Sequence, residues 1–113
     1  MPDKTERNWS MYLHFSQLAS MLVPILGLII PIILWQLKKE ESSYIDANGK
    51  AVLNWIISAI IYYIVGYLLI PFGIGIFIIL AVGILSIIFA IIGGLKANNG
   101  EVWPYPLSIG FLK

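Results

Sequence analysis

Charge is scarce in this sequence and absent from most of it. Only 12% of the 113 residues are Asp, Glu, Lys or Arg, compared with roughly 25% in soluble domains. Two runs carry no such residue: Asn8 to Leu37, which is 30 residues long, and Ala51 to Leu95, which is 45. As one helix the longer run would extend about 67 Å, whereas a bilayer core is roughly 30 Å thick, so this run must fold back once. The sequence therefore predicts a single integral membrane domain over residues 1–113.

Other missing residues exclude most catalytic and metal-binding chemistry. The chain has no Cys, which removes disulfides, thiolate metal sites and cysteine nucleophiles. Its one His, His14, has no second His or Cys with which to form a zinc site, and neither uncharged run holds an acidic residue. No phosphate-binding glycine loop or nucleophile elbow is present, and a net charge of +1 provides no basic field for nucleic acid. We therefore expect no enzyme activity, no cofactor, no metal and no nucleic-acid partner.

Polar and turn-forming residues divide the apolar sequence into helices. The segment Lys38–Lys50 is the long hydrophilic interruption between the two runs. Pro71–Gly75 places a proline and two glycines where the longer run has to turn. We expect long helices at about residues 47–70 and 75–96, each of a length that spans a bilayer.

The shorter uncharged run has two interpretations, because about 28 helical residues are too many for one upright span and few for two. Pro24, Gly27 and Pro31 lie in its middle. Either it is one tilted, kinked helix, which makes three spans in all, or it is a hairpin of two short helices at about residues 9–23 and 28–39. The hairpin places all seven Lys and Arg residues on one side and leaves both outer turns uncharged. We therefore predict an all-α membrane bundle of four helices with both termini in the cytoplasm.

Polar side chains inside the apolar segments are the first candidates for a functional site, because each needs a partner where water is absent. Asn54, Ser58 and Tyr62 recur every four residues and so share one face of a helix, and His14 and Gln17 share a face of the first helix. We expect a network between these helices. It either fixes the register of the helices or borders a path for a substrate or an ion.

A second pattern is a row of small residues, Ser86, Ala90 and Gly94, also at four-residue spacing. Small side chains allow helices to approach closely in lipid. The row is predicted to pack against another helix of the same chain or against a second copy. The segment after Lys96 contains an Asn-Gly pair and two prolines, so we expect it to leave the helix and lie along the membrane interface.

The hydrophilic segments are expected to meet at the cytoplasmic face. Asp46 is predicted to cap the third helix, with Lys50 one turn further along. Lys38 and Lys39 complement the C-terminal end of the preceding helix and can contact anionic headgroups.

Several blocks in this order resemble a known family. The blocks are Trp-x-x-x-Leu-His-x-Ser-x-Leu at 9–18, Ile-Leu-Trp-x-x-Lys-Lys at 33–39, Asp-x-x-Gly-Lys-x-x-x-Asn at 46–54, Lys-Ala-Asn-Asn-Gly-Glu at 96–101 and Tyr-Pro-Leu at 105–107. They are similar to the Tic-twenty-like small prokaryotic membrane proteins, distant relatives of a chloroplast inner-envelope import component. The resemblance implies a four-helix protein of the prokaryotic cell membrane with both termini on one side. With the loop lysines, its matching positions suggest a cytoplasmic-face motif of Lys38, Lys39, Asp46, Gly49, Lys50, Asn98, Asn99 and Gly100.

Two hypotheses for function follow, from different classes. In the first, the chain is a non-enzymatic accessory or scaffold protein in the bilayer that binds another membrane protein, or a second copy of itself, in envelope maintenance or stress tolerance. In the second, an oligomer forms a translocon-like conducting unit for ions or peptides, lined by the polar residues of the third helix and by His14.

Overall fold

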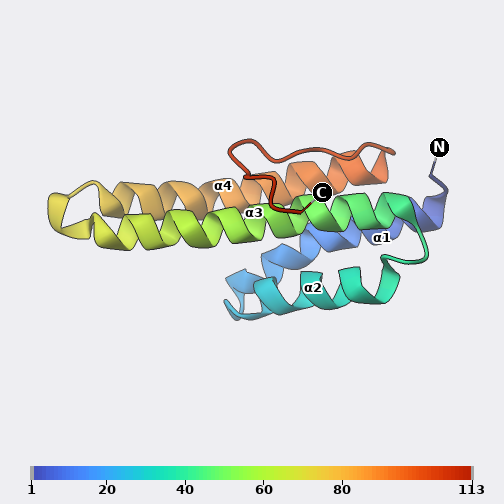
Figure 1. The fold of residues 1–113 in the computed structure, drawn as a ribbon, viewed down its shortest axis with the longest axis horizontal. Coiled ribbons are helices and arrows are strands. Elements are labelled where there is room, and N and C mark those ends of the chain that lie inside the picture. Colours follow the sequence, from blue (N-terminus) through green and yellow to red (C-terminus); the bar gives the residue numbers. More distant parts are fainter. Residues whose placement is uncertain (1, 113) are drawn as a thin grey trace.

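The computed structural model describes residues 2–112 and contains four α-helices in that range (Figure 1). In chain order the elements are α1 (Lys4–Ser16), the 3₁₀ turn η1 (Gln17–Met21), α2 (Leu26–Lys38), α3 (Ser43–Leu68), the 3₁₀ turn η2 (Ile70–Phe72) and α4 (Gly75–Asn98). The described residues include no strand. The predicted all-α architecture with four helices is confirmed, and the shorter uncharged run is a hairpin rather than one kinked helix.

The ends of α1 differ from the predicted 9–23, for a reason found at its first turn. The helix begins at Lys4 because the side chain of Asp3 accepts a hydrogen bond from the backbone N–H of Glu6 at 2.8 Å, which caps the N-terminus. It ends at Ser16, and η1 carries the chain on to the turn before α2. The prediction missed this first turn because its residues are charged and therefore do not belong to the apolar pattern.

The start of α3 also corrects a prediction. The N-cap is Ser42, whose hydroxyl accepts a hydrogen bond from the backbone N–H of Ile45 at 3.3 Å. Asp46 therefore lies inside the first turn of the helix and does not cap it. The predicted start near residue 47 was wrong, because a Ser supplies the cap earlier in the chain.

The two helix pairs differ in length. α3 has 26 residues and α4 has 24, and both are long and apolar enough to cross a membrane; at 1.5 Å per residue they extend about 39 and 36 Å. Only 22% of the most apolar stretch of α4 is buried, so this helix is not the hidden core of a soluble protein. α1 and α2 have 13 residues each, or about 20 Å. The α3–α4 hairpin therefore projects beyond the shorter pair in a molecule of 49 × 24 × 21 Å (Figure 1).

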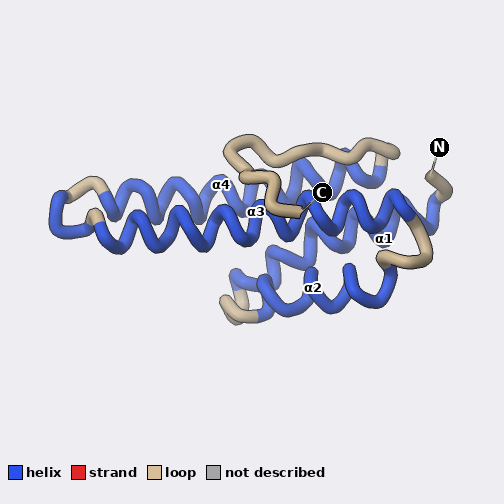
Figure 2. Tube along the Cα trace, viewed as in Figure 1, coloured by secondary structure: helices blue, strands red, loops and turns tan. Residues whose placement is uncertain are grey.

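The C-terminal tail, which follows α4, is part of the core. It runs back along the helices (Figure 2) and inserts Tyr105, whose side chain is 3% exposed. Tyr105 packs with Trp55 and Phe89, at ring-centroid distances of 6.1 and 5.9 Å. As expected, the chain leaves the helix after Asn98. Tyr105 and Trp103 of the tail join the aromatic packing between α3 and α4.

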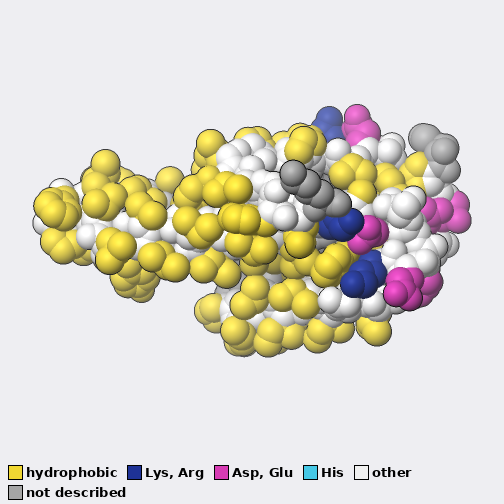
Figure 3. All heavy atoms as spheres, viewed as in Figure 1, with side chains coloured by type: hydrophobic (Ala, Val, Ile, Leu, Met, Phe, Trp, Pro, Cys, Tyr) yellow, Lys and Arg dark blue, Asp and Glu magenta, His cyan; other side chains and the backbone are white. Residues whose placement is uncertain are grey.

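Charged side chains gather at one end of the bundle, here called the charged end (Figure 3). Its members within the described residues are Asp3, Lys4, Glu6, Arg7, Lys38, Lys39, Glu40, Glu41, Asp46, Lys50, Lys96 and Glu101. Hydrogen bonds hold the contributing segments together: Ser42 donates to Glu6, Tyr44 donates to the carbonyl of Ala97, and Asn98 donates to Asn8. The N-terminus, the loop between α2 and α3, and the end of α4 therefore share one end of the molecule.

Candidate functional site

The largest buried polar cluster in residues 2–112 centres on His14, which is fully buried. Its Nε2 lies 2.8 Å from Oδ1 of Asn48, and its Nδ1 lies 2.5 Å from the hydroxyl of Tyr105. Gln17 donates to the same hydroxyl at 2.8 Å and to the carbonyl of His14 at 3.1 Å. This polar core joins α1, α3 and the tail.

The hydrogen bonds determine where the protons of the polar core lie. Asn48 donates through Nδ2 to the carbonyl of Tyr44 at 3.0 Å, so its Oδ1 faces His14 and accepts a proton from Nε2. Nδ1 of a neutral imidazole is then an acceptor, and Tyr105 donates to it. The Tyr105 oxygen in turn accepts from Gln17. With a neutral His14, every donor in these contacts therefore faces an acceptor.

The row of Asn54, Ser58 and Tyr62 lies on a different side of α3 and holds the tail. Asn54 accepts from the backbone N–H of Leu112 at 2.7 Å and donates to its carbonyl at 3.1 Å. Ser58 accepts from the N–H of Ile109 at 2.7 Å, and Tyr62 donates to the carbonyl of Leu107. The structure therefore separates the five predicted side chains into two groups, and each group binds a part of the tail.

Helix and tail match in spacing as well as in chemistry. Four residues along α3 advance about 6 Å, and two residues of extended chain advance about 6.6 Å. The step from Tyr62 to Ser58 therefore corresponds to the step from Leu107 to Ile109. The tail has two short-range backbone bonds of its own, from Ser108 to Tyr105 and from Phe111 to Ile109, and the polar row pairs further backbone groups at Leu107, Ile109 and Leu112.

At the charged end, Asp46 on α3 connects that helix to α2. Its carboxylate accepts a hydrogen bond from the indole N–H of Trp35 at 2.8 Å and pairs with Lys50 at 3.0 Å. Lys39 lies 4.5 Å above the Trp35 ring. Gly49 faces the same ring so closely that a Cβ at this position would collide with it. Four members of the predicted cytoplasmic-face motif therefore lie together around Trp35: Lys39, Asp46, Gly49 and Lys50.

The remaining motif residues lie elsewhere at the same end. Gly100 adopts a φ of 89°, and the N–H groups of Gly100 and Glu101 bond to the carbonyls of Ala97 and Lys96. This is the Schellman arrangement that closes a helix, in which a glycine is favoured at the left-handed position. Asn99 is the C-cap, Asn98 bonds to Asn8 at 2.9 Å, and Lys38 pairs with Glu41 at 3.5 Å. Their contacts account for capping and for the docking of α1 on α4.

The row of small residues on α4 faces the inside of the chain. Ser86 accepts a hydrogen bond from the indole N–H of Trp55 at 3.2 Å. Ala90 is fully buried, and a Cβ on Gly94 would collide with the ring of Phe15. The row thus accommodates α1 and α3 at short range within one molecule.

Sequence reasoning missed Asn48 and Tyr105, which complete the polar core. One signal was available for Asn48: it lies six residues before Asn54 on the same predicted helix, and an amide within an apolar helix needs a partner. Tyr105 stands 91 residues from His14, and spacing along the chain carries no information about such a contact.

The chemistry of these groups is that of neutral hydrogen bonding and paired surface charge. Within residues 2–112, no three His, Cys, Asp or Glu side chains lie close enough together to hold a metal ion. The polar core orients buried groups and connects the tail to two helices.

Comparison with known proteins gives one family. Residues 5–112 match the MamF/MmsF family, described as the magnetosome magnetite crystal formation protein family. No curated protein and no solved structure gives a match. The resemblance to the Tic-twenty-like proteins was therefore wrong: it relied on short loop and terminal blocks, whereas the family match covers almost the whole chain. This small helical membrane protein belongs to the MamF/MmsF family.

Proposed function

We propose that this protein is a non-catalytic accessory protein of a magnetosome membrane, where it contributes to magnetite crystal formation by binding another membrane protein at its charged end. The observation that carries the proposal is the separation of charge along the bundle: ionised groups gather at one end, and hydrophobic side chains dominate the surface in view beyond it (Figure 3). The family match supplies the biological process.

The proposed topology follows from helix lengths. α3 and α4 cross the bilayer, while α1 and α2, at about 20 Å each, enter from the charged side and return to it. Basic residues favour the cytoplasmic face, so the charged end is assigned there. The far end of the α3–α4 hairpin, where Phe72 is 79% exposed, then reaches the opposite side.

The charged end offers a partner surface of mixed sign. Glu41 and Glu101 pair with Lys38 and Lys96 at 3.5 and 3.6 Å, yet both carboxylates remain largely exposed. Exposed pairs contribute little to stability, but arranged charges of both signs can determine which partner binds. This supports recognition of a complementary charged protein surface.

The conducting alternative has less support. Asn54, Ser58 and Tyr62, which were expected to border a path, are hydrogen-bonded to the tail. A water-filled path would require the tail to leave.

The test uses a magnetite-forming bacterium from which its own family member has been deleted. We expect the wild-type chain to restore crystal size, measured by electron microscopy, and the double variant Glu41→Gln, Glu101→Gln to restore less at equal membrane abundance. The double variant Phe72→Leu, Phe77→Leu at the apolar end is the matched control and should behave as wild type. The proposal fails if the inserted wild-type chain leaves crystals unchanged, or if the charge variant restores them fully.

A further inference from the structure

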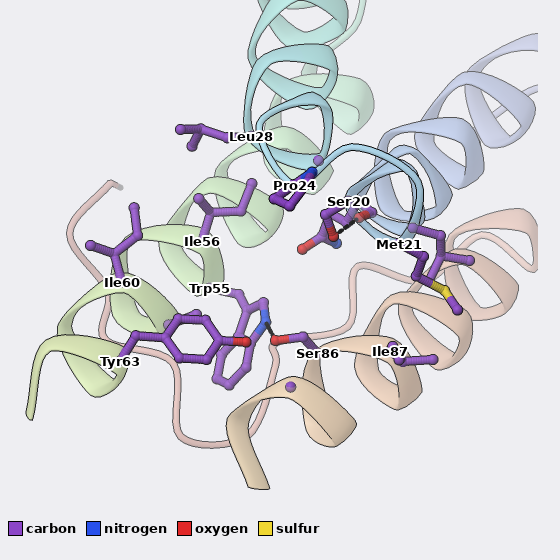
Figure 4. A pocket seen from close by; sticks show the side chains of 15 residues that line it. Ser20, Met21, Pro24, Leu28, Trp55, Ile56, Ile60, Tyr63, Ser86 and Ile87 are labelled. Carbon is purple, nitrogen blue, oxygen red and sulfur yellow. Dashed lines mark hydrogen bonds between the residues drawn. The ribbon is translucent and has the colours of Figure 1, made fainter. Parts of the chain in front are cut away.

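A cavity of about 410 Å³ lies where the α1–α2 hairpin turns beside α3 and α4 (Figure 4). Its volume is within the roughly 300–1,000 Å³ of typical small-molecule sites. The walls are mostly apolar, with Leu28, Ile56 and Ala59 among them. The cavity lies away from the charged end, and it shares Gln17 and Trp55 with the contacts of Tyr105.

The residues at the rim of the cavity indicate whether a ligand enters from the lipid or from water. Met21, Ile60 and Ile87 line it and are 66%, 44% and 37% exposed. None of its lining residues is charged. Ile60 lies ten residues beyond Lys50 on α3, which corresponds to about 15 Å below the charged end. Access is therefore from lipid hydrocarbon rather than from water.

Inside this apolar space, hydrogen-bonding groups lack partners. The hydroxyl of Tyr63 bonds to no other described residue, and Figure 4 shows it directed into the cavity beside Trp55 and Ser86. Ser86 accepts from Trp55 at 3.2 Å, but its own proton has no acceptor among the described residues. Polar groups at such depth are costly unless they are paired.

We propose that the cavity binds a neutral lipid that carries one carbonyl or hydroxyl oxygen. The oxygen accepts hydrogen bonds from Tyr63 and Ser86, and the hydrocarbon part fills the space between Ile56 and Ile87 and leaves through the rim into the bilayer. An apolar wall with a few convergent polar groups is the usual design of a small-molecule site. The inference is independent of any role in crystal formation.

The test is photo-crosslinking of the wild-type chain in liposomes with a long-chain alcohol that bears a diazirine. We expect saturable labelling, mapped by mass spectrometry to rim residues such as Ile60 and Ile87. Unlabelled alcohol should displace the probe roughly fivefold better than the alkane of equal length, the contribution of about one hydrogen bond. A ketone of equal length tests whether a carbonyl is accepted too.

Two variants and a control separate this site from general lipid contact. Gly83→Leu should abolish labelling, because a Cβ there meets only Tyr63 Oη at 3.6 Å and a larger side chain can grow into the cavity. Tyr63→Phe keeps the shape of the wall and, because only Ser86 is then left to donate, should reduce the preference for alcohol over alkane. Ala81→Leu lies exposed on the same helix and should leave labelling unchanged. Labelling spread evenly over lipid-facing residues, or an undiminished preference in folded Tyr63→Phe, would overturn the proposal.

Discussion

The Tyr105 hydroxyl is the point at which the tail joins the polar core, so its removal tests that part of the structure directly. Tyr105→Phe keeps the ring that packs on Trp55 and Phe89 and deletes only the oxygen. The loss affects the bond to His14 Nδ1 at 2.5 Å and the bond from Gln17 at 2.8 Å. Neither His14 nor Gln17 gains access to water, because both remain buried.

The size of the effect follows from what is left unpaired. Hydrogen bonds between helices in a membrane contribute on average about 0.6 kcal/mol and at most about 1.7, whereas an unsatisfied buried group costs about 1–3 kcal/mol. The substitution removes one hydrogen bond from His14 and one from Gln17. We therefore expect Tyr105→Phe to lower the free energy of unfolding by about 1–3 kcal/mol. Tyr62→Phe removes one exposed bond, to the carbonyl of Leu107, and should cost less than about 1 kcal/mol.

The assay is reversible unfolding in mixed micelles, followed by the far-ultraviolet circular dichroism of the helices. Tyr12→Phe changes an exposed tyrosine whose hydroxyl has no hydrogen-bond partner among residues 2–112, so it reports the background of a Tyr-to-Phe change. In the double variant Tyr105→Phe, His14→Leu, the loss of unfolding free energy should differ from the sum of the two single losses, because the two side chains share one hydrogen bond. The reasoning is refuted if Tyr105→Phe is no more destabilising than Tyr62→Phe, or if the two sites prove additive.

Three further predictions concern topology and close packing. Cysteines introduced at Asp3 and Ser43 should react with an impermeant maleimide from one face of sealed vesicles and a cysteine at Phe72 from the other; labelling of all three from the same face would contradict the spanning hairpin. Gly49→Ala should lower the unfolding free energy by about 1–2 kcal/mol in the same micelle assay. The new Cβ would collide with the Trp35 ring, and this overpacking outweighs the gain in helix propensity. Gly110→Ala is the control and should be close to neutral, because Gly110 has open space around it. Gly100→Ala should cost about 1–2 kcal/mol because its φ is 89°, and an unchanged unfolding midpoint would show that the helix end is not held in this form.

The helix pairs could be predicted because their signals are local. Pro24, Gly27 and the Pro71–Gly75 segment interrupt two uncharged runs, and the structure turns at both places. Helix ends were less accurate. Caps decide them, and Asp3 and Ser42 act through single backbone bonds that an apolar pattern does not record.

The partners of the polar residues could not be predicted in the same way. Four-residue spacing correctly placed Asn54, Ser58 and Tyr62 on one face of a helix, yet it gave no indication that the face would bind the tail. His14 and Tyr105 are 91 residues apart and meet through the tertiary packing of α1 and the tail. Spacing identifies which side chains share a face, whereas the element that covers that face depends on the tertiary fold.

The tail explains why the apolar helix α3 carries a polar row at all. Residues 107–112 form non-helical chain beside α3 down to Tyr62, which lies 12 residues beyond Lys50, or about 18 Å along the helix. Non-helical backbone at that depth is tolerated only where protein or water satisfies its N–H and C=O groups. Asn54, Ser58 and Tyr62 supply such partners at Leu112, Ile109 and Leu107. In the proposed topology, the polar row is therefore what allows the tail to lie in the membrane, where Tyr105 reaches His14.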